Sequence, residues 1–184
     1  MKISVHQPNL VPHFGFFYKM SQSDLFILLS QCQFEKNGYQ NRFFIQSTGK
    51  WITKPVCHGL EPLYKKQYVD GNNLTRMNTD FILWMRDLLS IDTRVVPDIA
   101  TSSTSTQRLI DNLNHYGATV YVTHPSAKDK YLDEKLIRGA GIDIEYSDHR
   151  LAKFNILELL LEHGIEGVQA QLYKKPQIKV VQSG

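Results

Sequence analysis

Residues 1–29, MKISVHQPNLVPHFGFFYKMSQSDLFILL, decide the fold of this chain. The stretch Lys2–Val5 is typical of a short strand, and the prolines that follow it end regular pairing because proline lacks a backbone N–H and has a fixed φ. Residues 14–23 suit a short amphipathic helix. Residues 25–29 form a continuous apolar run, which is typical of a strand covered on both faces. Strand, turn, helix and strand make a βαβ unit, which predicts parallel pairing.

Strands and helices go on alternating along the rest of the chain. A polar turn at 47–50 between two apolar runs predicts a β-hairpin, and glycine at 141 fits the left-handed end of a helix. Asn72 or Asn73 is expected to cap the helix that follows, with Trp84 on its apolar stripe. The expected strands are 43–46, 51–56, 94–96, 118–122 and 142–146, and the expected helices are 74–89, 107–116, 130–140 and 156–161, the last with Gly164 near its end.

These elements predict an α/β fold with a mostly parallel open sheet, helices on both of its faces and a β-hairpin insertion. We expect a single domain over residues 1–172 and a C-terminal tail over 173–184, since the tail shows no clear periodicity. At 184 residues the chain is long enough to bury a substantial core.

Composition excludes several classes of protein. A hydrophobic content of 42% with 21% charged residues is ordinary for a globular protein and argues against disorder or a collagen-like chain. The net charge of +3 suits a phosphate-bearing ligand but falls short of a nucleic-acid footprint. Cys32 and Cys57 lie in apolar stretches, which favours buried thiols in a reducing cytosol over a disulfide.

Neither a metal-ligand cluster nor a cofactor motif is visible in the sequence. No apolar run approaches the roughly 18 to 20 residues needed to cross a bilayer, and no signal stretch opens the chain. We therefore expect a cytoplasmic protein.

Polar side chains gather where the first strand ends. Because ligands of open α/β sheets bind at the carboxyl ends of the strands, His6, Gln7 and Asn9 are candidates for a site. An imidazole there suits a general base, and the amides would orient a substrate. The alternative role for His6 is to tie the loop at Pro8 to a backbone carbonyl. Gly15 would let the backbone approach an anion at a helix N-terminus, or would serve close packing.

A second polar cluster follows the strand at 25–29. Such a concentration of donors suits phosphate or carboxylate recognition, and Arg42 is able to make a bidentate contact. The alternative is a solvated loop. The members of this cluster are Lys36, Asn37, Gln40, Asn41 and Arg42.

The third cluster is the hydroxyl-rich stretch 101–106, which opens a helix. One hydroxyl suits an N-cap, and Thr104 and Thr106, with Arg108 in the first turn, are candidates for phosphate binding. After the strand at 118–122, Thr123 faces the same expected crevice, with Tyr131 and Asp133 near it, whereas His124 reads as part of a surface loop.

Taken together in this order, several motifs resemble the WbqC-like family over nearly the whole chain to about Leu172. The motifs are His6-Gln7-Pro8-Asn9, Gly15-Phe16-Phe17, Ser23-Asp24, Gln33-Phe34, Asn41-Arg42, Thr106-Gln107-Arg108-Leu109, Tyr131-Leu132-Asp133 and Gly141-Ile142. The resemblance implies a bacterial protein associated with surface-polysaccharide and amino-sugar pathways, of poorly defined biochemical role. Gln33 enters as a candidate substrate-binding residue through this motif.

The chain departs from the family pattern at two places. The family usually has an aromatic residue where His13 stands and an acidic pair near Gln31, where this chain is neutral. A more distant likeness is to the HxGH nucleotidyltransferases and pantoate-activating ligases, which implies a nucleotidyltransferase-like fold. In that likeness His13-Phe14-Gly15-Phe16 occupies the histidine-glycine turn, which makes His13 a candidate substrate-binding residue. Phe16 stands in place of the second histidine, and this loss should weaken adenylyl transfer.

The leading hypothesis is a transferase that modifies the amino group of a nucleotide-linked sugar or a similar phosphate-bearing small molecule, in surface-polysaccharide or amino-sugar biosynthesis. In it His6 is the base, Arg42 and the 104–106 region hold anionic groups, and Gln7, Asn9 and Asn41 orient the substrate. The alternative is a non-catalytic module that binds a nucleotide sugar or a pathway partner. Nucleic-acid binding rests only on the mild positive charge. The sequence identifies no cofactor, and it leaves a homo-oligomer open.

Overall fold

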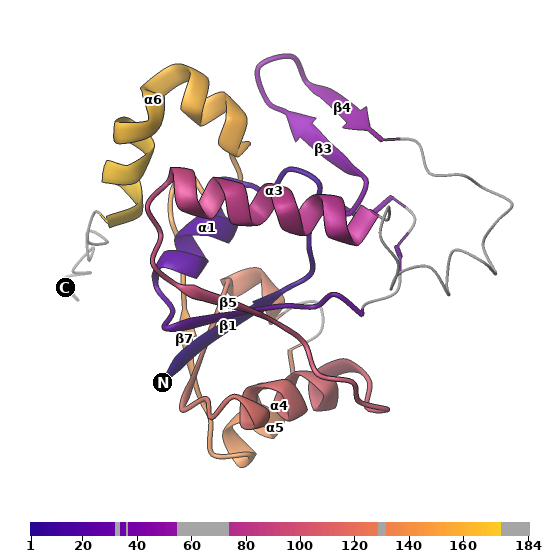
Figure 1. Cartoon of the computed structure of the whole chain (residues 1–184). Coiled ribbons are helices and arrows are strands. Elements are labelled where there is room, and N and C mark those ends of the chain that lie inside the picture. The colour runs from indigo at the N-terminus through magenta and orange to yellow at the C-terminus, as the bar shows by residue number, and fades with distance from the viewer. Residues whose placement is uncertain (32–33, 36, 55–73, 129–131, 174–184) are drawn as a thin grey trace, which may run out of the picture.

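The computed structural model describes residues 1–31, 34–35, 37–54, 74–128 and 132–173. At its centre lies a five-stranded sheet in the order β5-β2-β1-β6-β7 (Figure 1), and all four pairings are parallel. The strands are β1 (Lys2–His6), β2 (Leu25–Leu28), β5 (Arg94–Pro97), β6 (Val120–Thr123) and β7 (Asp143–Tyr146). The predicted parallel sheet is confirmed.

Helices cover both faces of the sheet, as the sequence predicts. In Figure 1, α1 (Phe14–Ser21), α3 (Leu74–Leu88) and α6 (Ile156–Tyr173) lie above the sheet, and α4 (Ser105–His115) and α5 (Glu134–Gly139) lie below it. A short 3-10 turn, η1 (Pro125–Ala127), follows β6.

Two apolar cores, one on each face, explain why the central strands read as continuous apolar runs. Phe26 and Leu28 of β2 belong to the core under α1, α3 and α6, whereas Leu25 and Ile27 of the same strand belong to the core over α4 and α5. All four residues are buried because successive side chains of a strand point to opposite faces.

The path of the chain reverses between β1 and β6. From β1 the chain adds β2 and β5 on one side of the sheet, then crosses to place β6 and β7 on the other side. Ligands of doubly wound sheets bind outside the carboxyl ends of the strands at such a switch point. His6 and Thr123 are the last residues of the two strands that flank it.

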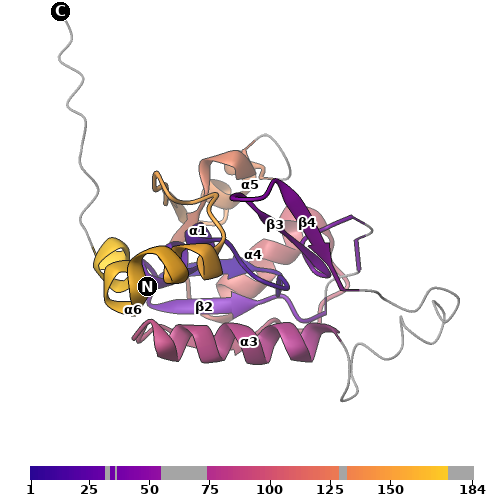
Figure 2. The same cartoon turned by 90° about the horizontal axis from the view of Figure 1, so that it is seen from above.

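The predicted β-hairpin is confirmed, with β3 (Arg42–Ile45) antiparallel to β4 (Lys50–Thr53). It lies on the side of the molecule toward which the β2 arrow points (Figure 2). The carboxylate of Glu158 on α6 fastens its turn, because the backbone N–H groups of Gln46 and Ser47 donate to the two carboxylate oxygens at 2.8 Å each.

Three predictions about helices need correction. The helix expected over 14–23 is not amphipathic, because α1 buries most of its side chains, including that of Lys19. Trp84 is 55% exposed and lies outside the apolar stripe of α3. The helix expected over 130–140 begins only at Glu134, because the side chain of Asp133 caps it by accepting from the N–H groups of Lys135 and Leu136.

Of the two glycines predicted near helix ends, Gly141 is confirmed and Gly164 is not. Gly141 follows α5 with φ 79°, in the left-handed region. Gly164, with φ 67° and ψ 177°, breaks α6 into two helical halves, and the sequence predicted only the first. The candidate caps Asn72 and Asn73 and both cysteines lie outside the described residues.

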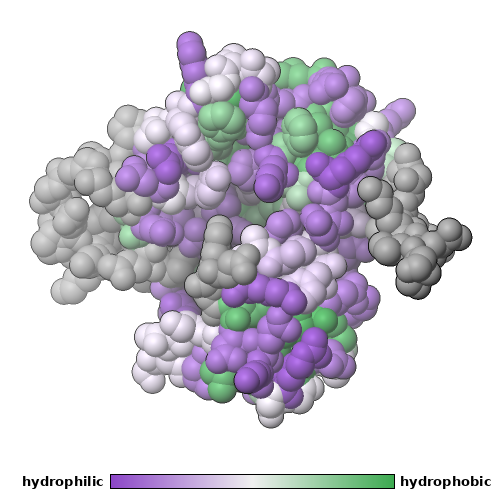
Figure 3. Space-filling view, turned by 180° about the vertical axis from the view of Figure 1, so that it is seen from behind, coloured by the Kyte–Doolittle hydropathy of each residue, from purple (hydrophilic) through white to green (hydrophobic). Residues whose placement is uncertain are grey.

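Exposed hydrophobic side chains of the described surface include Leu161 and Ile165 on α6. Seen from behind (Figure 3), hydrophobic residues gather in separate groups among hydrophilic ones. Within the described ranges no helix has both the length and the apolar character needed to cross a membrane.

Candidate functional site

His6 ends the central strand beside the switch point, and one hydrogen bond fixes its imidazole. Its Nδ1 lies 2.9 Å from the backbone carbonyl oxygen of Gln7. A carbonyl only accepts, so Nδ1 carries the hydrogen and Nε2 keeps its lone pair. The ring of Phe16 meets the imidazole edge to face, with centroids 5.0 Å apart. The contact with Gln7 is the loop-tying bond that the sequence offered as the alternative role, and it also orients Nε2.

Lys19 lies next to this imidazole and was not identified as a candidate from the sequence. It is only 5% exposed, its Nζ donates to the backbone oxygen of Val5 at 2.9 Å, and it lies 5.7 Å from the centre of the Phe26 ring. Burial lowers its pKa from the ordinary 10.5 to about 7. Within the described part of the chain no carboxylate pairs with Lys19, so a buried cation stands here without an anion.

Burial and the neighbouring cation keep His6 neutral. Burial has the largest effect, and the charge of Lys19 adds to it, so that the pKa of His6 falls to about 3, although the hydrogen bond to Gln7 works in the opposite direction. Burial also lowers the pKa of His13. Both imidazoles therefore stay uncharged near pH 7.

Asn78 of α3 holds two loops together beside His6. Its Nδ2 donates to the backbone oxygens of Pro8 at 2.9 Å and Gln40 at 2.8 Å, and it is almost fully buried. The Oδ1 atoms of Asn78 and of the buried Asn9 are both enclosed without a hydrogen-bond partner. Two unpaired buried acceptors are unusual, because such groups normally find a partner. Asn78 could not be singled out from the sequence, because it sits among ordinary helical residues.

Asn41 and Arg42 differ in what they do. The Asn41 Nδ2 donates to the backbone oxygen of Lys54 at 3.1 Å, so this amide closes the base of the hairpin. The Arg42 guanidinium lies 4.2 Å from the centre of the Trp51 ring. Tyr39 links this group to the loop after β1, since its ring lies 5.1 Å from that of His13 and its carbonyl accepts from the Leu10 N–H at 2.9 Å.

The N-terminus of α1 is occupied by the protein itself. The N–H groups of Phe14 and Gly15 donate to the carbonyls of Phe154 and Ala152 at 2.9 and 3.1 Å. A Cβ on Gly15 would come within 2.9 Å of the Ala152 Cβ and carbonyl oxygen. The glycine therefore serves close packing against the segment before α6, which is the second role that the sequence offered, and its amide is not open to an anion.

Asp98 organises the ends of β5 and β2 and was also missed. Its fully buried carboxylate accepts from the N–H and the hydroxyl of Ser30, both at 2.8 Å, and pairs with Arg108 of α4. We call this group the Asp98 cluster. The guanidinium of Arg108, predicted to bind phosphate, already faces a carboxylate.

The hydroxyl-rich stretch divides into internal and exposed members. Thr106 is buried and accepts from the Asp133 N–H at 3.4 Å. Thr104 precedes α4, is exposed and makes no capping hydrogen bond. Thr123 is buried at the end of β6, where its carbonyl accepts from the Ser147 N–H at 2.7 Å. Among these threonines only Thr104 presents its side chain to solvent.

The remaining candidates divide between a turn and the undescribed segments. Asn37 is exposed with φ 66°, a left-handed conformation that asparagine tolerates in turns. Gln33, Lys36 and Tyr131 lie outside the described residues. His124 is a surface residue whose Nδ1 contacts Ser126, as the sequence suggested.

The carboxyl edge of the sheet therefore brings several predicted residues together. The loop that follows β1 adjoins the loop before Arg42, because Asn78 bonds to both loops and Tyr39 contacts His13. The first of these loops follows His6 and carries Gln7, Asn9 and His13. Thr104 and Arg108 lie further along the same edge, where β5 ends.

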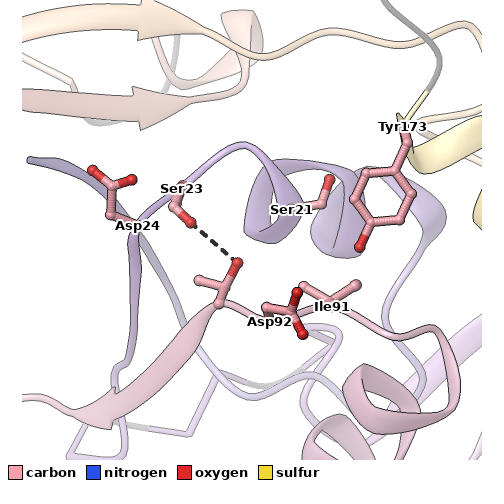
Figure 4. A pocket seen from close by; sticks show the side chains of 7 residues that line it. Ser21, Ser23, Asp24, Ile91, Asp92 and Tyr173 are labelled. Atoms are coloured by element: carbon pink, nitrogen blue, oxygen red, sulfur yellow. Dashed lines mark hydrogen bonds between the residues drawn. The ribbon is translucent and has the colours of Figure 1, made fainter.

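A hollow of about 310 Å³ lies at the opposite edge of the sheet (Figure 4). Asp24 and Asp92 line it at the entrances to β2 and β5, together with Thr93, whose hydroxyl donates to the Ser23 carbonyl at 3.1 Å, and Tyr173. Two carboxylates repel a phosphate-bearing ligand, and ligands of such sheets bind at the other edge. We do not assign the site to this hollow.

Comparison with known proteins places these features in a family. The model of the WbqC-like protein family matches residues 7–63 and 53–158. The chain is also similar to the uncharacterized protein Rv1507c of Mycobacterium tuberculosis (strain ATCC 25618 / H37Rv), with 23% identity over 193 residues that cover 80% of this chain and 82% of that protein. No solved structure matches the chain, so the likeness to HxGH nucleotidyltransferases stays a prediction.

Proposed function

Because the chain belongs to the WbqC-like protein family, we propose that it is a transferase that modifies the amino group of a nucleotide-linked sugar, in the surface-polysaccharide or amino-sugar pathways that the resemblance implies. The substrate would lie outside the carboxyl ends of β1 and β6. The order of the strands supports a nucleotide ligand, since doubly wound sheets of this order bind nucleotides at their switch point.

The observation that carries this proposal is the orientation of His6. With Nδ1–H held by the Gln7 carbonyl, the lone pair of Nε2 is free to accept a proton at the edge where a ligand would bind. In the proposed step the amino nitrogen of the sugar attacks the carbonyl carbon of an acyl or aminoacyl donor. A new N–C bond forms, and the bond between that carbon and the donor's carrier breaks with its electron pair leaving on the carrier. The nitrogen loses a proton to Nε2, which passes it on to the departing carrier.

The electrostatics of the site suit an anionic substrate. Lys19 is buried and no described carboxylate pairs with it, and because its pKa is about 7, a bound phosphate group would favour its charged form. A bound phosphate would in turn raise the pKa of His6 from about 3 towards the range in which a base works best near pH 7. Substrate binding would thus strengthen the base.

The second candidate, a non-catalytic module that binds a nucleotide sugar, is favoured by the same low pKa. An imidazole with a pKa of about 3 is a weak base, and its bond to Gln7 also has a purely structural use. The two candidates differ in whether His6 is needed for turnover or only for the shape of the loop.

The test compares His6→Gln with His163→Gln, which changes an exposed histidine of α6. UDP- and dTDP-linked amino sugars are screened by thermal shift with acyl and aminoacyl donors, and a ligand at 100 times its Kd adds about 2.7 kcal/mol. We expect H6Q to lose about 100-fold or more in turnover while still binding the nucleotide sugar, and H163Q to match the wild type. Full turnover in H6Q excludes the base, and stabilisation of the wild type without product from any donor favours the binding module.

A further inference from the structure

The hairpin carries an exposed aromatic group that the proposed function has not used. Tyr39 and Trp51 are 41% and 43% exposed, and their ring centroids are 5.6 Å apart. The ring of Phe44 lies 5.4 Å from that of Trp51, directly across the β3–β4 ladder. We call Tyr39, Arg42 and Trp51 the hairpin platform.

Arg42 gives this platform a positive charge that no described carboxylate balances. Its guanidinium rests 4.2 Å from the centre of the Trp51 ring, and its Nε is buried without a hydrogen-bond partner. Arg108 offers the contrast, because its guanidinium faces Asp98. Planar guanidinium groups recognise phosphate well, since their N–H donors are arranged in a fork.

The platform is fixed beside the loop that follows His6 at the end of β1. Tyr39 contacts His13 at 5.1 Å between centroids and accepts from the Leu10 N–H, and Asn78 bridges the carbonyls of Pro8 and Gln40. On the far side the turn of the hairpin is held by Glu158 of α6. Exposed rings held from both sides are ready to stack a ligand without first being ordered.

We propose that the hairpin platform is the subsite for the nucleoside diphosphate part of the substrate, with the base stacked on Tyr39 and Trp51 and a phosphate facing Arg42. This inference rests on the proposed function and deepens it, because it assigns the base and one phosphate to the hairpin and leaves the other phosphate and the sugar to the edge at Lys19 and His6. Every nucleobase has a π-face on which an aromatic side chain can stack, so the rings would accept any base. Arg42, which no described carboxylate pairs with, would attract the negatively charged phosphates of the nucleotide.

The two tryptophans of the chain provide an internal probe. Trp51 is on the platform, whereas Trp84 lies on the outer side of α3 against Phe81. The variant Trp84→Phe leaves Trp51 as the only tryptophan, and Trp51→Phe leaves Trp84. Each is titrated with UDP, dTDP, ADP, GDP and CDP, and with inorganic pyrophosphate, while tryptophan fluorescence is recorded.

We expect at least one nucleoside diphosphate to quench W84F in a saturable manner and pyrophosphate to quench it at least 10-fold less well. W51F should show no quenching and should bind the same nucleotide about 10- to 100-fold more weakly by calorimetry. Arg42→Gln should weaken binding of the diphosphate and flatten its dependence on salt, with Arg42→Lys between the two. The double variant W84F/H6Q should be quenched by the nucleotide to the same extent as W84F.

Three results would overturn the proposal. They are absence of quenching in W84F at millimolar concentrations of all five nucleotides, wild-type affinity in W51F, and quenching that depends on protein concentration alone, which would mark the platform as a contact between copies of the chain. Because the readout is binding, the platform can fail while H6Q still abolishes turnover, and it can succeed in a protein that has no transferase activity.

Discussion

Two regions of the same sheet edge treat their positive charges in opposite ways. In the Asp98 cluster, Arg108 meets a buried carboxylate that also accepts from Ser30. At the end of β1, Lys19 is more deeply buried and no described carboxylate accompanies it. A cation with a built-in partner braces the strands, whereas a cation without one is a cost that a bound anion would relieve. A ligand with negative charge is therefore expected at the second region.

Removal of the Asp98 carboxylate should destabilise the protein more than any other change considered below. Asp98→Ala leaves Arg108 and the Ser30 groups without their acceptor, and we expect a loss of about 3 kcal/mol in the free energy of unfolding. This is the low end of the range for buried pairs because the Arg108 side chain is 24% exposed. Urea denaturation measures it. A loss below about 1 kcal/mol would show that the cluster is not a brace.

The matching change at the other region should act in the opposite direction. Lys19→Met removes an unpaired buried charge and keeps an apolar side chain of similar size, so we expect stabilisation of about 1–2 kcal/mol at pH 6. In the folded protein the pKa of Lys19 is about 7, against 10.5 ordinarily. Between these values the unfolded chain binds more protons, so wild-type stability rises with pH and the advantage of K19M shrinks.

Denaturation of both proteins at pH 6 and at pH 9.5 tests this prediction. Destabilisation by K19M at pH 6 would mean that the hydrogen bond from Lys19 to the Val5 carbonyl outweighs the cost of burying the charge.

A smaller effect distinguishes the two helices on the lower face of the sheet. Asp133 caps α5 through two backbone N–H groups, so Asp133→Ala should cost about 1 kcal/mol. Thr104 precedes α4 but makes no capping bond, so Thr104→Ala should change stability by less than about 0.5 kcal/mol. Thermal unfolding of the two variants gives the answer. If T104A loses as much stability as the Asp133 variant, the Thr104 hydroxyl caps α4 and is not available to contact a phosphate.

The protonation of His6 should not change over the ordinary pH range. With a pKa of about 3, the imidazole of His6 should not titrate between pH 5 and 8, and its ring should keep the hydrogen on Nδ1. Long-range ¹H–¹⁵N spectra with H6Q for assignment report both properties. A midpoint near 6.5 would show that His6 is solvated and that Lys19 does not act on it.

Periodicity predicted most of this fold because the central strands are buried on both faces. The apolar runs at β1 and β2 and the helical spacing of α3 and α4 follow directly from that burial. Trp84 was misplaced because a large aromatic residue on a helix is readily assigned to its apolar face, whereas α3 buries other residues, such as Ile82 and Met85. The second half of α6 was missed because Gly164 reads as an end rather than a kink.

The candidate site could be anticipated only at strand ends, because strand ends can be read from sequence but pairing across the fold cannot. His6 and Arg42 stand out as polar residues beside apolar runs. Lys19 does not, since a lysine in a short helix reads as solvent-facing; its signal was that Phe16, Phe17, Tyr18 and Met20 leave that helix no polar face. Asp98, a single acid after Pro97, acquires meaning only when β5 lies beside β2.

The fastening of early residues by late ones has a consequence for how the protein is made. The entry to α1 is held by the carbonyls of Ala152 and Phe154, and the turn of the hairpin is held by Glu158. A ribosome delivers these anchors only after more than a hundred intervening residues have emerged. The nascent chain therefore contains β1, α1, β2 and the hairpin long before the residues that fasten them, and a pause in translation ahead of residue 152 would leave the entry to α1 and the turn of the hairpin without their anchors.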